Sequence, residues 1–161
     1  MNTTLTRPPR TPRPLFALYT ALLLVGAALA AWWATWTSPE EARNWGITPQ
    51  EADYAITPPP LPEWAVPVLG ITGLLLALAG GALVIRELRA RRATFSWVLA
   101  AFLLLPVALF GGLWWSVSTA PTIGANIGLG LVYIVLGPLA VVFLLGALGS
   151  ALTALFPRRD R

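Results

Sequence analysis

Five carboxylates gather in one polar stretch, residues 37–63, and they are the side chains best suited to chemistry. Paired carboxylates can exchange protons with a substrate or bind a cation. Here they have no His, Lys or Cys to act with, because the chain contains none. We therefore expect no catalytic residue, no metal site and no cofactor, and a protein that is not an enzyme. The five are Glu40, Glu41, Glu51, Asp53 and Glu63.

The same stretch carries a repeated helix-start pattern. Ser38-Pro39-Glu40-Glu41 is followed ten residues later by Thr48-Pro49-Gln50-Glu51. A Ser or Thr cap, Pro at the first helical position and Glu at the third are typical of helix N-termini. The pattern predicts two short helical turns, from Pro39 to about Trp45 and from Pro49 to about Ala55. It also explains Glu41 and Glu51 as capping residues, and predicts an ordered loop.

The elements around this loop are strongly apolar. Of 161 residues, 57% are hydrophobic and 11% charged, and the mean hydropathy is +0.70. Soluble domains carry about a quarter charged residues, so the composition excludes a soluble domain and also disorder. Four uncharged stretches could each cross a hydrocarbon core of about 30 Å, and only helices satisfy their backbone there. We expect an all-α, four-helix membrane protein with spans at about 15–36, 64–85, 95–117 and 124–150.

These spans define the organisation of the chain. A disordered tail rich in Arg and Pro, residues 1–14, precedes a transmembrane domain at 15–156, and a basic C-terminus follows at 157–161. Residues 86–94 form a short loop between the second and third spans. The alternative is that residues 1–30 form a secretory signal cleaved after Ala28-Leu29-Ala30. The apolar run continues through Trp32 and Trp33, which argues against cleavage.

The distribution of Arg predicts the orientation. With four crossings, ten of the eleven Arg residues lie on one side, and only Arg43 lies in the acidic loop 37–63. Cytoplasmic loops are enriched in Lys and Arg. We expect a plasma membrane protein with both termini cytoplasmic, in the inner membrane if the source is bacterial, as the Arg- and Ala-rich composition suggests. The high pI then reflects topology, and we expect no nucleic-acid partner.

Polar side chains within the spans are few. None is ionisable, which argues against ion-coupled transport. We expect the hydroxyl groups of Thr20, Thr72, Ser116 and Thr153 to bond to a carbonyl one turn earlier. Tyr133 can reach a neighbouring helix or the interface. Pro106 and the Gly137-Pro138 pair should bend their helices, and such bends either create a lipid cavity or serve packing alone.

Two sets of residues are candidates for contacts with lipid or with another protein. Aromatic side chains cluster at the outer interface, where indole rings prefer to lie. Small residues recur every four positions, which lets helices approach closely; the rows are Gly26-Ala30-Ala34, Gly73-Ala77-Gly81 and Gly124-Gly128. Packing inside the bundle and docking of an external helix both fit them. The candidate contacts are Trp36, Trp45, Tyr54, Trp64, Trp114, Trp115, Gly73, Ala77 and Gly81.

These features favour an accessory or scaffold subunit of a larger membrane complex, with a membrane-protein partner or a second copy and with membrane lipid as its contacts. The alternative is a small uncoupled transporter or lipid-handling protein that acts alone or as a homo-oligomer. A polar cavity between the helices would favour the alternative. An interior filled by Leu and Ala would count against it.

Overall fold

The computed structural model describes residues 14–48, 51–121 and 125–156, and this part of the chain is all-helical. Its elements are α1 (Pro14–Ala34), α2 (Pro39–Asn44), α3 (Ala65–Arg89), α4 (Phe95–Thr119) and α5 (Ala125–Leu155). Four of these helices, all except α2, are long and apolar enough to cross a membrane, as the sequence predicts. The tail 1–13, Gly124 and residues 157–161 lie outside the described residues.

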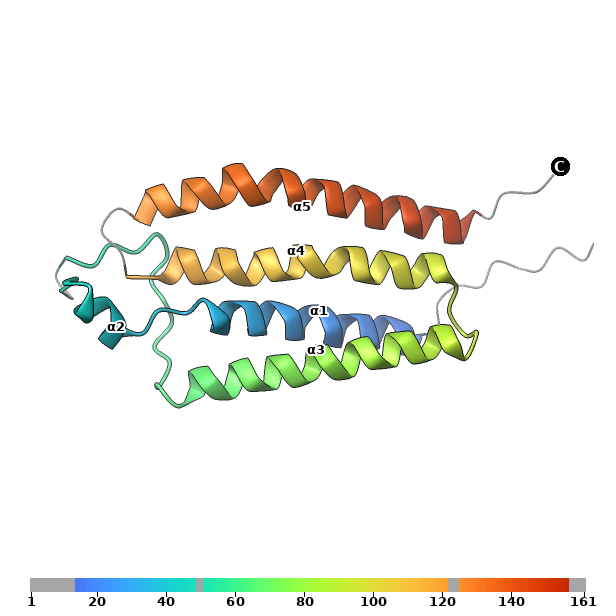
Figure 1. Cartoon of the computed structure of the whole chain (residues 1–161), viewed down its shortest axis with the longest axis horizontal. Helices are drawn as coiled ribbons and strands as arrows, with labels where there is room; N and C mark the ends of the chain where they lie inside the picture. The colour runs from blue at the N-terminus through green and yellow to red at the C-terminus, as the bar shows by residue number, and fades with distance from the viewer. Residues whose placement is uncertain (1–13, 49–50, 122–124, 157–161) are drawn as a thin grey trace, which may run out of the picture.

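The four long helices lie side by side in one layer (Figure 1). Their order across the layer is α3, α1, α4, α5, so the first helix of the chain is central. Within the described residues, α5 packs only against α4. Both α4 and α5 run as continuous helices through their internal prolines, Pro106 and Pro138.

The closest helix pair is α1 and α3, and glycines allow it. A Cβ atom added at Gly73 would lie 2.6 Å from the Cβ of Leu29, and one added at Gly80 would lie 2.8 Å from the carbonyl oxygen of Tyr19. A Cβ at Gly26 would meet the backbone of Ala77. Backbones this close gain dispersion contacts that compensate for the absence of a hydrophobic drive in lipid.

A residue in the left-handed conformation ends α3 in the turn between α3 and α4. Arg91 has φ of 53°. Its N–H bonds to the carbonyl of Leu88, and the N–H of Arg92 bonds to that of Glu87. This is the Schellman arrangement, which usually places glycine at the left-handed position. The Glu87 side chain, only 6% exposed, forms an ion pair with Arg92 at 3.8 Å.

The segment between α1 and α3 confirms the first expected turn and corrects the second. The Ser38 hydroxyl accepts a hydrogen bond from the N–H of Glu41 at 3.0 Å, and Pro39 begins α2. Gly46, with φ of +80°, follows the helix. In the second copy the N–H of Ala52 bonds to the carbonyl of Thr48, and residues 52–55 are not helical; Pro49 and Gln50 lie outside the described residues.

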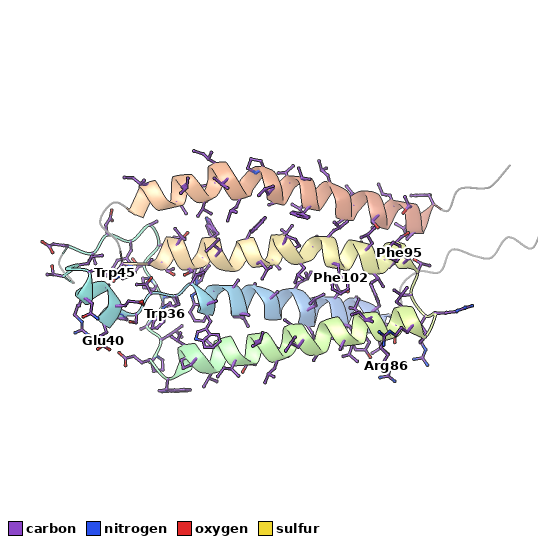
Figure 2. The ribbon with its side chains drawn as sticks, viewed as in Figure 1. Trp36, Glu40, Trp45, Arg86, Phe95 and Phe102 are labelled. Atoms are coloured by element: carbon purple, nitrogen blue, oxygen red, sulfur yellow. The ribbon has the colours of Figure 1, made fainter. Side chains whose placement is uncertain are left out.

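The two ends of the layer differ in charge. The start of α1, the end of α5 and the α3–α4 turn lie at one end, and α2 lies at the other (Figure 1). The last turn of α3 and the α3–α4 turn together carry four Arg residues, and Figure 2 shows Arg86 and Phe95 at this end and Glu40 and Trp45 at the other. We call these the Arg-bearing end and the loop end. The residues at the Arg-bearing end are Arg86, Arg89, Arg91 and Arg92.

Candidate interaction surfaces

Three of the expected aromatic contact residues meet at the loop end. Trp36, Tyr54 and Trp115 line a cavity of about 230 Å³, together with the buried Trp32 and the run Pro58–Pro60. The cavity combines residues from α1, α4 and the loop between α1 and α3. The polyproline run, which the sequence predicts as extended, forms one of its walls.

Two hydrogen bonds hold this aromatic cavity together. The Ser116 hydroxyl of α4 donates to the carbonyl of Thr35 at 2.7 Å, just after the end of α1. The N–H of Ile56 donates to the carbonyl of Ser118 at 2.8 Å, which ties the loop to α4. The expectation that Ser116 bonds within its own helix is therefore wrong. A carbonyl at the frayed end of α1 has no intrahelical partner, and Ser116 satisfies it instead.

The other three aromatic residues are not part of the cavity. Trp45 is 61% exposed and Trp64 is 70% exposed. Trp114 donates from its indole N–H to the hydroxyl oxygen of Tyr133 at 3.0 Å, which links α4 to α5. The reach of Tyr133 to a neighbouring helix is thus confirmed. The six aromatic residues that the sequence analysis assigns to one interface therefore have three different environments. Three line the cavity, Trp114 bonds to another helix, and Trp45 and Trp64 are exposed.

Of the acidic side chains in the loop, that of Glu51 caps a turn. The Glu51 carboxylate accepts hydrogen bonds from the Thr48 hydroxyl at 2.7 Å and from its N–H at 3.4 Å, which is the carboxylate half of a capping box. Glu41 contributes its backbone N–H to the first cap. Glu40 and Asp53 are exposed. Across residues 14–48, 51–121 and 125–156, no three potential metal ligands come together.

The row of small residues on α3 faces α1 of the same chain. Gly73 is buried there, and Ala77 lies against Gly26. Gly81 is half-buried, and a Cβ at this position would lie 3.6 Å from the Leu23 side chain, an ordinary contact. Gly80 occupies the tight position instead. Gly128, from the third expected row, is exposed, and a Cβ there would lie 3.5 Å from Val117.

Several contact residues were missing from the sequence prediction. Gly70 lies against Trp33, and Gly112 of α4 lies against the carbonyl of Ala28, so that a side chain at either would clash. The Ser150 hydroxyl of α5 donates to the carbonyl of Ser96 at 2.7 Å. The seven-residue interval between Gly73 and Gly80 was a usable signal, because it spans almost two full helical turns.

An apolar groove opens between α1, α4 and α5. It has a volume of about 550 Å³ and runs along the half of these helices that is nearer the Arg-bearing end. Thr20 and Trp97 are its only lining residues with polar side-chain atoms. The Thr20 hydroxyl bonds to the carbonyl of Phe16 at 3.0 Å, as expected. Thr153, outside the groove, likewise donates to the carbonyl of Ser150.

The apolar side chains of α5 are mostly uncovered by the described residues. In its most apolar stretch only 6% of the residues are buried, against 22–28% in the other three long helices. Ile127 and Ile134 are 80% and 75% exposed. At Gly130 and Gly137 an added Cβ would meet nothing within 4 Å among the described residues. These two glycines are not used for packing in this part of the chain.

Comparisons with protein-family models, with curated proteins and with solved structures give no match to this chain. The functional interpretation therefore depends on the arrangement of its own residues. What the structure establishes is four membrane-spanning-length apolar helices in one layer, as in a multi-pass integral membrane protein.

Proposed function

We propose that this protein is a non-enzymatic accessory or scaffold subunit of a larger membrane complex. The observation that carries the proposal is α5, which packs against one helix only and presents Gly130 and Gly137 to open space. Seven residues separate these glycines, so they lie on nearly the same face of the helix. Together with the exposed apolar residues beside them, they offer a close-packing surface for a helix of another membrane protein.

The free-energy cost of glycine within a helix supports a partner at this face of α5. Glycine within a helix is less favourable than alanine by about 0.5–1 kcal/mol. In α1, α3 and α4 such glycines allow helices to approach, as Gly26, Gly73 and Gly112 do. Gly130 and Gly137 have no such use within the described residues. A partner helix packed against them would supply one.

The chemistry of the spans agrees with a subunit that has no reaction of its own. In α1, α4 and α5 no side chain is ionisable except those of Tyr19 and Tyr133. Proton and ion pathways through membranes use buried ionisable residues. The groove between α1, α4 and α5 is lined mainly by Ala and Leu, which disfavours the passage of a polar solute. The groove is not the polar cavity that the sequence analysis names as support for a small transporter. It is unfilled and apolar and so suits a lipid chain, which favours the lipid-handling form of the second candidate function.

We place the Arg-bearing end in the cytoplasm and the loop end outside the plasma membrane. The described Arg residues support this, because four of the five lie in the last turn of α3 and in the α3–α4 turn and cytoplasmic loops are enriched in Arg. Under this orientation both termini are cytoplasmic. The aromatic cavity of Trp36, Tyr54 and Trp115 then lies at the outer interface.

Native mass spectrometry after gentle extraction through a C-terminal tag tests the proposal. We expect the full chain to leave the membrane with a membrane protein at fixed stoichiometry. A protein bound at variable, substoichiometric amounts would not count as a partner. A lone monomer, or a homo-oligomer that carries lipid, would contradict the accessory role and favour the lipid-handling alternative.

A further inference from the structure

The groove between α1, α4 and α5 is built from small side chains. Six of its lining residues are alanines, and their short side chains leave the space between the helices unfilled. The groove is partly open, and its volume is about 550 Å³. Its lining is apolar, so at membrane depth it suits a hydrocarbon chain. The six are Ala17, Ala21, Ala100, Ala101, Ala147 and Ala151.

The length of the groove matches one leaflet of a bilayer. Its lining runs from Phe16 to Leu24 on α1 and from Leu144 to Ala151 on α5. At 1.5 Å per residue these stretches span about 10–12 Å. Half of a hydrocarbon core is about 15 Å, whereas a helix that crosses the whole core is about 20 residues, or about 30 Å, long. The groove therefore matches the reach of an acyl chain in a single leaflet and covers less than half the length of a spanning partner helix.

The groove lies in the half of the layer that is nearer the Arg-bearing end. Arg92, which also pairs with Glu87, stands in the turn that leads into α4, five residues before Trp97. Arg86 and Phe95 lie at the same end of the layer (Figure 2). Arg residues at the membrane surface attract anionic headgroups. Trp97 lines the groove near the start of α4, and indole rings prefer the headgroup level.

We propose that this groove holds an acyl chain of an anionic phospholipid, with the headgroup at the Arg-bearing end. The lipid occupies the space between α1 and α5, which do not pack against each other in the described part of the chain. It thereby stabilises α5, which α4 alone holds. This inference does not depend on the accessory role, because it concerns the half of α5 beyond Leu144 and not Gly130 or Gly137.

A lipid competition experiment tests the proposal. The purified full chain is freed of lipid and incubated with equal amounts of phosphatidylglycerol and phosphatidylcholine that carry the same acyl chains. Bound lipid is then counted by native mass spectrometry. We expect one retained phosphatidylglycerol per chain. Its preference over phosphatidylcholine should be about fivefold for each Arg engaged, from about 1 kcal/mol per residue near the surface.

Substitutions within the groove make the test specific. Ala17 and Ala21 are exposed and line the groove, so the double variant Ala17→Leu/Ala21→Leu should fill it and lose the retained lipid. Ala82→Leu is the matched control. Ala82 is also exposed, at a similar distance from the Arg-bearing end, but lies on α3 outside the groove. It should retain the lipid.

Three results would overturn the proposal. The first is equal retention of the two lipids by the unmodified chain. The second is unchanged lipid retention in Ala17→Leu/Ala21→Leu. The third is a cross-link from a photoreactive residue at position 21 to another protein's helix instead of to lipid. If the double variant does not fold, Ala151→Leu on the opposite wall provides the same test.

Discussion

Replacing Gly73 with alanine is expected to destabilise the protein by about 1–3 kcal/mol, the usual cost of overpacking a tight interface. The added Cβ would lie 2.6 Å from the Cβ of Leu29 and 3.0 Å from the backbone nitrogen of Ala30. Neither atom is the end of a flexible side chain, so α1 and α3 must move apart. Gly73→Leu should cost more and reduce the amount of folded protein. Thermal unfolding in detergent measures both effects.

Gly81→Ala is the matched control for this prediction. Gly81 lies on the same helix two turns later, and an added Cβ there makes only an ordinary contact with Leu23 at 3.6 Å. The gain in helix propensity, about 1 kcal/mol, should make this variant neutral or more stable. Equal melting temperatures for Gly73→Ala and Gly81→Ala would show that α1 and α3 do not approach as closely as described.

Replacing Gly130 and Gly137 with leucine together is expected to abolish association with a partner while the chain itself stays folded. Neither position has a described neighbour within 4 Å of an added Cβ. The Cβ atoms of the new leucines therefore meet no described neighbour, and we expect the longer side chains to keep a partner helix at a distance. In native mass spectrometry the amount of complex should fall at least about tenfold, which corresponds to a loss of about 1.4 kcal/mol of binding free energy. The melting temperature of the isolated chain should not fall.

Gly149→Leu provides the control on the same helix. Its added Cβ also meets nothing within 4 Å in the described part of the chain. It lies about a third of a turn around the helix from Gly137, because successive residues advance by about 100°. This variant should keep the partner. A complex that survives Gly130→Leu/Gly137→Leu would show that this face of α5 is not the docking surface.

The membrane spans could be predicted from sequence, whereas their ends could not. Hydropathy places the second span at 64–85 and stops at the first charge, Arg86. The helix continues to Arg89, because the Schellman bonds to Glu87 and Leu88 need those residues to be helical. Similarly, α5 continues to Leu155 and does not end near 150. Composition detects the hydrocarbon core but not the helical turns that extend beyond it.

The small-residue row was predicted on the helix that packs against α1, but the tight position Gly80 was missed. A spacing of four selects Gly73, Ala77 and Gly81, but a helix repeats every 3.6 residues. A contact row therefore alternates steps of three and four, and Gly80 takes the tight position. The crossing of α1 and α3 determines which alternation applies. That crossing is a property of the helix pair and cannot be read from α3 alone.

The aromatic cluster could be predicted in composition but not in arrangement. Trp114 and Trp115 are adjacent, so their side chains leave α4 about 100° apart. One bonds to Tyr133 on α5, and the other lines the cavity with Trp36 and Tyr54. The rotation of α4 about its own axis decides which of the two rings faces α5 and which faces the cavity. That rotation is fixed by long-range contacts such as the bond from Ser116 to Thr35.

Cysteine accessibility tests most directly the central claim of four membrane crossings with the Arg-bearing end inside. The chain contains no Cys, so Glu40→Cys and Ala90→Cys each introduce a single thiol at an exposed position. In intact cells, a membrane-impermeant thiol reagent should label position 40 at once and position 90 only after permeabilisation. Labelling of both positions from outside, or of position 90 alone, would contradict this arrangement.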